Sequence, residues 1–321
     1  MRLKLVPTKT KIDFFKLSSI TFGTSLIGML IAIFLFLTIG LNFGIDFRGG
    51  TTIRTDSEIM VDVAKYRSVL SRLDLGDISI TEVFDPTKPG QNVAQIRIEQ
   101  QEDEGSATVK TVEMVQKALR TIDSKMTFPS VESVGPKVSG ELIKTAVIAV
   151  ISAIFAVLFY IWLRFEWQFS VGAVAALIHD IVLTIGIFSV LQIKFDLAII
   201  AALLTIVGYS LNDTVVVFDR VRENLRKYKK TELKDVLNLS INETLSRTVM
   251  TSVTTLLALI SLFVLGGDVI RGFVFAMIWG VIVGTYSSVF IASNILLRLG
   301  VKRDWSKPSA GAGTQFSGID A

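Results

Sequence analysis

Hydrophobic residues gather in six long stretches along the chain. Uninterrupted apolar runs of about 20 residues, the length that crosses a bilayer as a helix, occur at 18–41, 142–163, 168–191, 195–218, 249–267 and 270–297. The first run stands alone, and the other five follow one another within residues 141–299. The pattern predicts a polytopic α-helical membrane protein with six transmembrane helices.

The polar region between the first two runs, residues 42–140, has the pattern of a small folded domain. Apolar and polar residues alternate in four predicted strands, and two segments between them have helical periodicity. The strands are 51–55, 77–84, 92–99 and 127–134, and the helices are 59–73 and 107–122. The order βαββαβ is typical of an α+β, ferredoxin-like domain.

This domain carries no visible set of catalytic side chains, so binding or docking is the more economical role. An exposed sheet edge or face can hold an extended peptide by strand addition. Small domains of this kind also serve only to pack against a neighbouring subunit. Both alternatives remain open from the residues.

Basic residues beside the apolar runs predict the orientation of the helices. Several lysines precede the first run, which places residues 1–17 in the cytoplasm by the positive-inside rule. Six crossings then return the C-terminus to the cytoplasm and leave residues 42–140 outside it. The basic segment 219–246 is predicted as a cytoplasmic loop, and the Gly-rich polar tail 300–321 as disordered. The first run is too long for a signal peptide and lacks a cleavage site, so it is expected to be a retained anchor.

Composition narrows the chemistry of this 321-residue chain. Cysteine is absent and there is a single histidine, which excludes disulfides and thiolate metal sites and makes a zinc site improbable. We expect no cofactor and no metal. The net charge of +4 comes from residues that flank apolar runs, so membrane topology explains it better than binding to nucleic acid.

One acidic residue, Asp213, falls within the fourth apolar run. Charged groups in the membrane cost a few kcal/mol each and are functional by default. Tyr209 lies one turn earlier on the same helix face. Gly208 and Asn212 form an adjacent strip, where a small residue and an amide predict close contact with another helix.

Arg247 lies near the start of the fifth run, at a depth similar to that of Asp213, and Thr251 follows it on the same face. An ion pair between Arg247 and Asp213 would hold the acid charged, and its separation would favour protonation. That is the physical basis of a proton-coupled switch. The alternatives are that Arg247 only extends toward the headgroups and that Asp213 makes a structural polar contact.

The third run contains a second acid, Asp180, beside His179. A lone buried histidine is more often a packed residue than a proton carrier, and Asp180 is a secondary candidate for the ion pathway. Two intramembrane aspartates also admit an intramembrane aspartyl protease. The Gly-x-Gly-Asp pattern of such proteases is missing around Asp213, so this enzyme function is a distant third.

Five sequence blocks stand in one order around the predicted domain. They are GIDFRGGT from Gly44 to Thr51, VGPKVSGEL from Val134 to Leu142, ALIHDIVLTIG in the third run, VGYSLNDTVVVFDRVREN in the fourth and SRTVMTSVTTL in the fifth. In this order they resemble the SecF family, whose members are membrane subunits of the bacterial Sec protein-export machinery and work with the related SecD. The resemblance extends over residues 17–299, and the tail lies outside it.

The resemblance implies a function and assigns roles to residues. SecD and SecF together look like the two halves of a resistance-nodulation-division transporter, and they use the proton gradient, or sodium in some relatives, to assist late translocation of unfolded proteins after the SecYEG channel. Asp213 matches the family's membrane acid and Arg247 its basic partner. Tyr209, Asn212, Thr251 and Asp180 would support the ion pathway, and the family motif at the membrane exit contains Asp46, Phe47, Gly49 and Gly50.

The expected partners are therefore SecD, SecYEG, the unfolded exported chain and membrane lipid, in the cytoplasmic (inner) membrane of a bacterium. No enzymatic activity is expected. Two alternatives remain. One is a half-transporter of the same superfamily that expels small hydrophobic molecules, although such pumps carry much larger outer domains. The other is a passive membrane scaffold.

Overall fold

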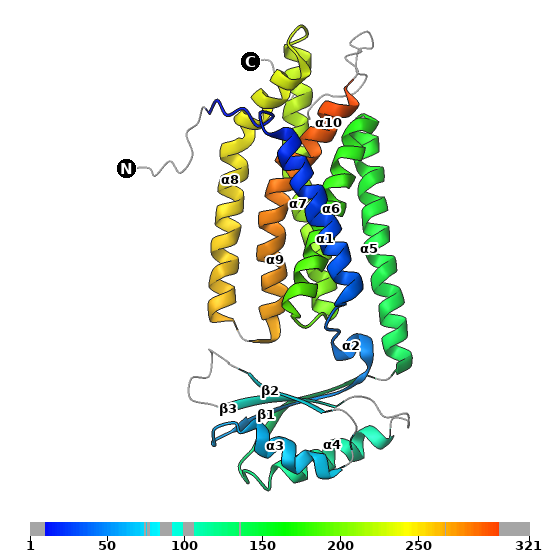
Figure 1. Cartoon of the computed structure of the whole chain (residues 1–321), viewed down its shortest axis with the longest axis vertical. Coiled ribbons are helices and arrows are strands. Elements are labelled where there is room, and N and C mark those ends of the chain that lie inside the picture. The colour runs from blue at the N-terminus through cyan, green and yellow to red at the C-terminus, as the bar shows by residue number, and fades with distance from the viewer. Residues whose placement is uncertain are drawn as a thin grey trace, which may run out of the picture.

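The computed structural model describes residues 10–73, 75, 78–83, 92–98, 106–134, 136–266 and 268–301. Within these residues six helical segments are long and apolar enough to cross a membrane, which confirms the six predicted spans. They are α1 (Ser18–Thr38), α5 (Pro136–Arg164), α6 (Trp167–Leu191), α7 (Leu197–Lys227), α8 (Leu233–Leu265), and a last span made of α9 (Asp268–Ser287), the π-helix η2 (Ser288–Ala292) and α10 (Ser293–Leu299). Figure 1 shows these helices as one bundle, with a small domain at one end.

The segment predicted as a loop over 219–246 is mostly helical. α7 continues to Lys227 and α8 begins at Leu233, so only five residues connect them. The start of α8 repeats apolar residues at helical spacing, and these pack against the end of α7 in one buried cluster that contains Val221, Leu225, Val236, Leu237 and Ile241. A search for apolar runs misses such an amphipathic extension because its other faces are polar.

The second span also begins earlier than residue 142, where the sequence pattern predicts its start. α5 begins at Pro136, where the fixed φ of proline suits the first turn of a helix. The predicted disorder of the tail concerns residues 302–321, which lie outside the described residues, as do residues 1–9.

The small domain has the predicted ferredoxin-like fold. Its sheet is antiparallel with the strand order β2-β3-β1-β4, and α3 and α4 cover the face turned away from the bundle (Figure 1). Its core joins β1, β3 and both helices through residues such as Ile53, Ile96, Leu70 and Leu119. The elements are β1 (Gly50–Ser57), α3 (Val63–Leu70), η1 (Ser71–Leu73), β2 (Ile78–Val83), β3 (Asn92–Ile98), α4 (Ser106–Leu119) and β4 (Thr127–Val134).

Asp123, in the turn after α4, ties that turn to the end of β1. Its carboxylate accepts hydrogen bonds from Ser57 Oγ (2.7 Å) and from the backbone N–H groups of Glu58 (3.1 Å) and Lys125 (2.9 Å). The hydrogen bond from Ser57, followed by that from Lys125, lowers the pKa of Asp123 below its ordinary value of 3.8. A lowered carboxyl pKa stabilises the fold above the pKa of the unfolded chain, and this stability is lost as the pH falls.

We therefore expect Asp123→Asn to speed hydrogen exchange of the Ser57 and Glu58 amides near pH 7, relative to the unchanged chain. This difference should shrink as the pH falls from about 4 toward the lowered pKa of the native carboxyl, where the native side chain also becomes neutral. The measurement is exchange of the intact chain, corrected for the intrinsic effect of pH. A difference that stays constant with pH would contradict the assignment.

Helices α7 and α9 approach closely because α9 carries glycines one turn apart. A Cβ atom added to Gly280 would overlap the side chain of Ile206, and one added to Gly284 would lie 3.1 Å from Cβ of Ser210. Small residues four apart permit such close backbone contact in membranes. The pair brings the buried polar residues of α7 and α9 together.

Candidate functional site

Asp213 lies near the middle of α7, and its side chain faces the bundle interior with 7% of its surface exposed. Both carboxylate oxygens accept hydrogen bonds. Thr248 Oγ1 on α8 donates to Oδ1 at 2.6 Å, and Ser288 Oγ, in the first residue of the π-helix η2, donates to Oδ2 at 2.7 Å. Three spans therefore meet at this one acid.

Burial and hydrogen bonding act on this carboxylate in opposite directions. Burying a carboxylate costs several kcal/mol even after the protein relaxes, and each hydrogen bond to a charged group contributes about 1.5–3 kcal/mol. Two such bonds offset a cost of similar size. The cost of a charge on Asp213 therefore depends on these two hydrogen-bond partners.

The hydroxyl group of Ser288 suits both protonation states of Asp213. Ser288 Oγ lies 2.7 Å from Asp213 Oδ2 and 3.0 Å from the carbonyl oxygen of Thr285, but a hydroxyl has one hydrogen to donate. When Asp213 is ionised, that hydrogen points to the carboxylate. When Asp213 is protonated, the hydrogen can turn to Thr285 and the serine oxygen can accept from the acid.

Asp180 on α6 is fully buried and lies in the same polar core. Its Oδ2 accepts hydrogen bonds from Ser210 Oγ at 2.6 Å and from Ser287 Oγ at 2.8 Å. Ser287 and Ser288 are consecutive residues, so adjacent positions at the junction of α9 and η2 contact the two buried aspartates. π-helical turns inside α-helices often occur at functional sites.

Arg247 lies near the acid but does not bind it. The arginine is exposed, and among the described residues the only hydrogen-bond partners of the Asp213 carboxylate are Thr248 and Ser288. The ion pair considered from the sequence is thus not formed in this structure.

The residues expected to support the ion pathway separate into two groups. Tyr209 is partly buried and donates a long hydrogen bond of 3.4 Å to Ser252 Oγ, which in turn lies 2.7 Å from Thr285 Oγ1. Asn212 and Thr251 are exposed, and the Thr251 hydroxyl donates to carbonyl groups of its own helix. Tyr209 therefore contacts α8 and, through Ser252, Thr285 of α9, whereas Asn212 and Thr251 face out of the chain.

The serines that hold the two acids were not found from the sequence. Ser210, Ser287 and Ser288 are single small polar residues in apolar runs, where serine commonly bonds only to its own helix. A signal is nevertheless present in the last run, since two adjacent serines follow the glycine pair Gly280 and Gly284. Close helix packing beside paired hydroxyls indicates a polar contact between helices.

The family motif at the membrane exit joins α1 to the loop between α6 and α7. The backbone N–H of Gly44 donates to the carbonyl of Phe195 at 2.7 Å, and Asp46 Oδ2 accepts from the N–H of Leu197 at 3.0 Å at the start of α7. Phe47, in α2 (Ile45–Arg48), is buried and packs near Phe195. The motif therefore fixes the end of α1 to the bundle.

The two glycines of the motif turn the chain into the sheet. Gly49 has φ of 75° and Gly50 has φ of 118°, which are values that side chains with a Cβ rarely adopt. β1 begins at Gly50, and a groove of about 520 Å³ lies between the polar face of the sheet and the end of the bundle. The domain is thus connected through a defined turn and is not packed solidly on the helices.

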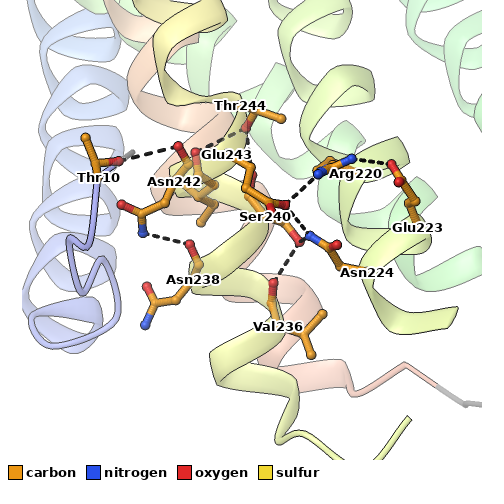
Figure 2. A network of polar contacts seen from close by, with 11 residues as sticks. Thr10, Arg220, Glu223, Asn224, Val236, Asn238, Ser240, Asn242, Glu243 and Thr244 are labelled. Carbon is orange, nitrogen blue, oxygen red and sulfur yellow. Dashed lines mark hydrogen bonds and ion pairs between the residues drawn. The ribbon is translucent and has the colours of Figure 1, made fainter. Parts of the chain in front are cut away.

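A polar network fixes the start of α8 at the other end of the bundle (Figure 2). The Asn242 side chain exchanges two hydrogen bonds with the backbone of Ile12, of 2.9 and 2.8 Å. The next residue of α8, Glu243, accepts hydrogen bonds from Arg220 and Asn224 of α7, both at 2.7 Å. The helix that carries Thr248 and Arg247 is thus held by α7 and by the N-terminal segment.

Comparison with known proteins gives matches over nearly the whole chain. A family model described as "Protein export membrane protein SecD/SecF, C-terminal" matches residues 114–302, and one described as "SecD/SecF GG Motif" matches residues 34–57. The protein translocase subunit SecF of Cereibacter sphaeroides is 62% identical, over 100% of this chain and 99% of its own length. The protein translocase subunit SecDF of Brucella abortus is 41% identical over 94% of this chain, which spans 39% of that longer protein.

A solved structure agrees with these matches. The crystal structure of SecDF from Thermus thermophilus, described as a translocon-associated membrane protein, superimposes with a TM-score of 0.80 at 34% identity. The superposition covers 93% of this chain and 40% of the SecDF chain. The matched fold includes both the six-helix bundle and the small sheet domain.

Proposed function

The chain belongs to the SecD/SecF family of protein-export membrane proteins, and we propose that it couples ion flow to protein export through Asp213. It serves export as a bacterial membrane subunit of the SecF type. The observation that carries the coupling role is the position of Asp213. It is a buried carboxylate held by hydroxyl groups from two other spans, each able to adjust to the gain or loss of a proton.

Proton or sodium flow provides a sufficient driving force for this role. One charge that crosses 100 mV releases about 2.3 kcal/mol, which is comparable to the contribution of one of the hydrogen bonds at Asp213. A change of charge there would alter the contacts of α7 with α8 and η2. Arg247 supports the ionised form from the exposed side, and Tyr209 with Asp180 continues the polar core.

An exposed polar strip on α7 and α8 supports the association with SecD. In the long SecDF relatives, the part that matches this chain makes up less than half of the polypeptide. A SecD partner would supply the remaining part of the assembly. In this chain alone the strip faces out of the bundle, although charged and polar groups are expensive in contact with lipid. It consists of Thr205, Gly208, Asn212, Arg247, Thr251 and Thr254.

We propose that SecD covers this strip. The prediction that Gly208 meets another helix is wrong for the helices of this chain, because a Cβ added at Gly208 would have no described atom within 4 Å. The same small residue suits a close approach by a helix of the partner. Asn212 and Arg247 would then face the interface between the two halves.

The absence of cysteine from the chain allows a clean test of that interface. We expect a cysteine introduced by Gly208→Cys to form disulfides, on mild oxidation, with single cysteines placed in the middle of SecD transmembrane helices. The matched control is Gly23→Cys on α1, where a Cβ likewise meets no described atom within 4 Å. Equal cross-linking of the two positions would contradict the assignment.

The orientation of the chain follows from its charges. Arg222, Arg226, Lys227, Lys229 and Lys230 gather at the end of the bundle away from the sheet domain, and basic residues favour the cytoplasm. We therefore propose that the sheet domain is on the outer side of the cytoplasmic membrane. There it would act on an unfolded chain that leaves SecYEG.

The experiment that tests the function follows a secreted precursor in inverted membrane vesicles with and without this chain and SecD. We expect late translocation to be faster when both subunits and an ion gradient are present. Collapse of the gradient should remove the difference. A pump for small hydrophobic molecules would leave precursor translocation unchanged, and a passive scaffold would assist it equally without a gradient.

A further inference from the structure

We propose that His179 and Asp180 form a second proton site, whose occupancy is coupled to that of Asp213 through the adjacent serines Ser287 and Ser288. This inference rests on the proposed function, because it assumes that Asp213 gains and loses a charge. It extends that function to a pair of residues on another helix. The coupling is energetic, and no proton needs to pass directly between the two acids.

The His179 and Asp180 side chains form a buried pair with an unused position. Nδ1 of His179 lies 3.0 Å from Asp180 Oδ1, and both side chains are about 1% exposed. An ionised Asp180 only accepts hydrogen bonds, so beside it Nδ1 carries the hydrogen. The other ring nitrogen, Nε2, is buried and has no hydrogen-bond partner among the described residues. Nε2 is therefore the atom that would take up or release a proton.

The other contacts of Asp180 are suited to a lasting negative charge. Two hydroxyl donors, Ser210 and Ser287, point to its Oδ2, and the ring N–H of His179 points to its Oδ1. Three donors on one carboxylate favour the ionised form, since hydrogen bonds to a charged acceptor are the strong ones. This charge can stabilise an imidazolium beside it.

Each of the two serines has two hydrogen-bond acceptors within reach, one buried acid and one backbone carbonyl of its own span. Ser288 Oγ is 2.7 Å from Asp213 and 3.0 Å from the Thr285 carbonyl, while Ser287 Oγ is 2.8 Å from Asp180 and 3.2 Å from the Gly284 carbonyl. Each hydroxyl can donate to only one acceptor at a time. Because the two residues are consecutive, a change of contact at Ser288 alters the peptide that also positions Ser287.

The other ionisable groups that could act on the His179 and Asp180 pair lie on the helices around it. Tyr286 of α9 stacks on the His179 ring, with a centroid distance of 6.0 Å, and its hydroxyl bonds to Ser25 of α1 at 2.9 Å. α7 supplies Asp213 and Tyr209, and α8 supplies Arg247 beyond Asp213. α1 has no charged residue between Ser18 and Thr38, and the charges of α5 and α10 stand near the ends of those helices. Asp213 is thus the group whose change of charge would reach the pair.

The sign of the coupling follows from Coulomb attraction. An ionised Asp213 favours a positive charge on His179, and a neutral Asp213 disfavours it. Uptake of a proton at Asp213 would therefore favour release of one at His179. Tyr286 connects the histidine ring to α1, which leads to the glycine turn and the outer domain.

The single histidine of the chain makes this proposal directly measurable. The chain is labelled with ¹⁵N-histidine and assembled with unlabelled SecD in lipid vesicles, so that one imidazole is observed. Its ¹⁵N shifts distinguish the charged ring from either neutral form. We expect the charged form to appear within a titration from pH 5 to 9, and the ratio of charged to neutral ring to fall several-fold in Asp213→Asn.

Two variants test the role of the serine link, each also combined with Asp213→Asn. Ser288→Ala removes the Asp213 contact that leads to Ser287, and the matched control Thr248→Val removes the other hydrogen bond of Asp213 without touching the serines. We expect the effect of Asp213→Asn on the histidine to be reduced in Ser288→Ala and retained in Thr248→Val, as a double-mutant cycle measures. Cross-linking to SecD at Gly208→Cys verifies that each variant assembles.

Three outcomes would overturn the inference. The first is a histidine ring that stays neutral throughout the titration. The second is a charged fraction of the ring that Asp213→Asn leaves unchanged. The third is an effect of Asp213→Asn on the ring that is equal in Ser288→Ala and in Thr248→Val. These outcomes would leave the proposed function intact if Asp213→Asn still abolished gradient-driven export. Normal gradient-driven export by Asp213→Asn would instead overturn the proposed function.

Discussion

Replacing Asp213 by asparagine is expected to abolish the gradient-dependent part of protein export while the chain still assembles in the membrane. The amide has nearly the same shape as the carboxyl group and can exchange hydrogen bonds with Thr248 and Ser288, so the local packing is kept. It cannot bind a proton or carry a charge. The work of one charge across 100 mV, about 2.3 kcal/mol, corresponds to a rate effect of up to about 40-fold.

The measurement is translocation of a secreted precursor at a fixed ion gradient. Asp219→Asn provides a matched control, since it makes the same chemical change on the same helix. Asp219 is exposed and lies 3.7 Å from Arg164 in a surface ion pair, and such pairs contribute about 0–1 kcal/mol. We expect the control to export normally. Equal export by both variants would show that the charge of Asp213 is not used.

Replacing Gly280 by valine is expected to destabilise the bundle strongly. The new side chain would overlap the side chain of Ile206, which is 1% exposed and would have to shift within the packed bundle. Overpacking of this kind costs about 1–3 kcal/mol or more. Because α7 carries Ser210 and Asp213, and the span of α9 and η2 carries the two linking serines, their separation should also reduce gradient-driven export.

The readout for this variant is thermal unfolding of the purified complex, together with export. Gly23→Val is the matched control, because a Cβ at Gly23 meets no described atom within 4 Å. The control should melt close to the unchanged protein. If Gly280→Val were as stable as the control, the close contact of α7 and α9 would not be required for the site.

The large features of the fold follow from patterns that the sequence displays locally. Six apolar runs predict the spans because lipid requires a continuous apolar helix, and alternation predicts the βαββαβ domain because one sheet face is buried. Asp213 and Asp180 stand out because acids are rare in such runs. These residues are buried, as their cost in the membrane would suggest.

The partners of the acids depend on how the helices pack and so could not be predicted. Ser287 and Ser288 contact acids on two different helices, α6 and α7, because glycines bring α9 onto α7 and consecutive helical residues point in different directions. The position of Arg247 depends on the long amphipathic start of α8, which the sequence pattern predicts as part of a loop. Asn212 on α7 and Thr251 on α8 face outward, although each of these helices also carries buried polar residues. A four-residue spacing shows which residues lie on one face of a helix, but not what that face contacts.

The most direct test of the central claim is the ion current through patched membranes that contain this chain, SecD and an exported substrate. Proton and sodium gradients are varied separately, and the unchanged chain is compared with Asp213→Asn. Coupling through Asp213 predicts a current that follows one of the two gradients and disappears in the variant. A current that persists unchanged in Asp213→Asn would contradict it.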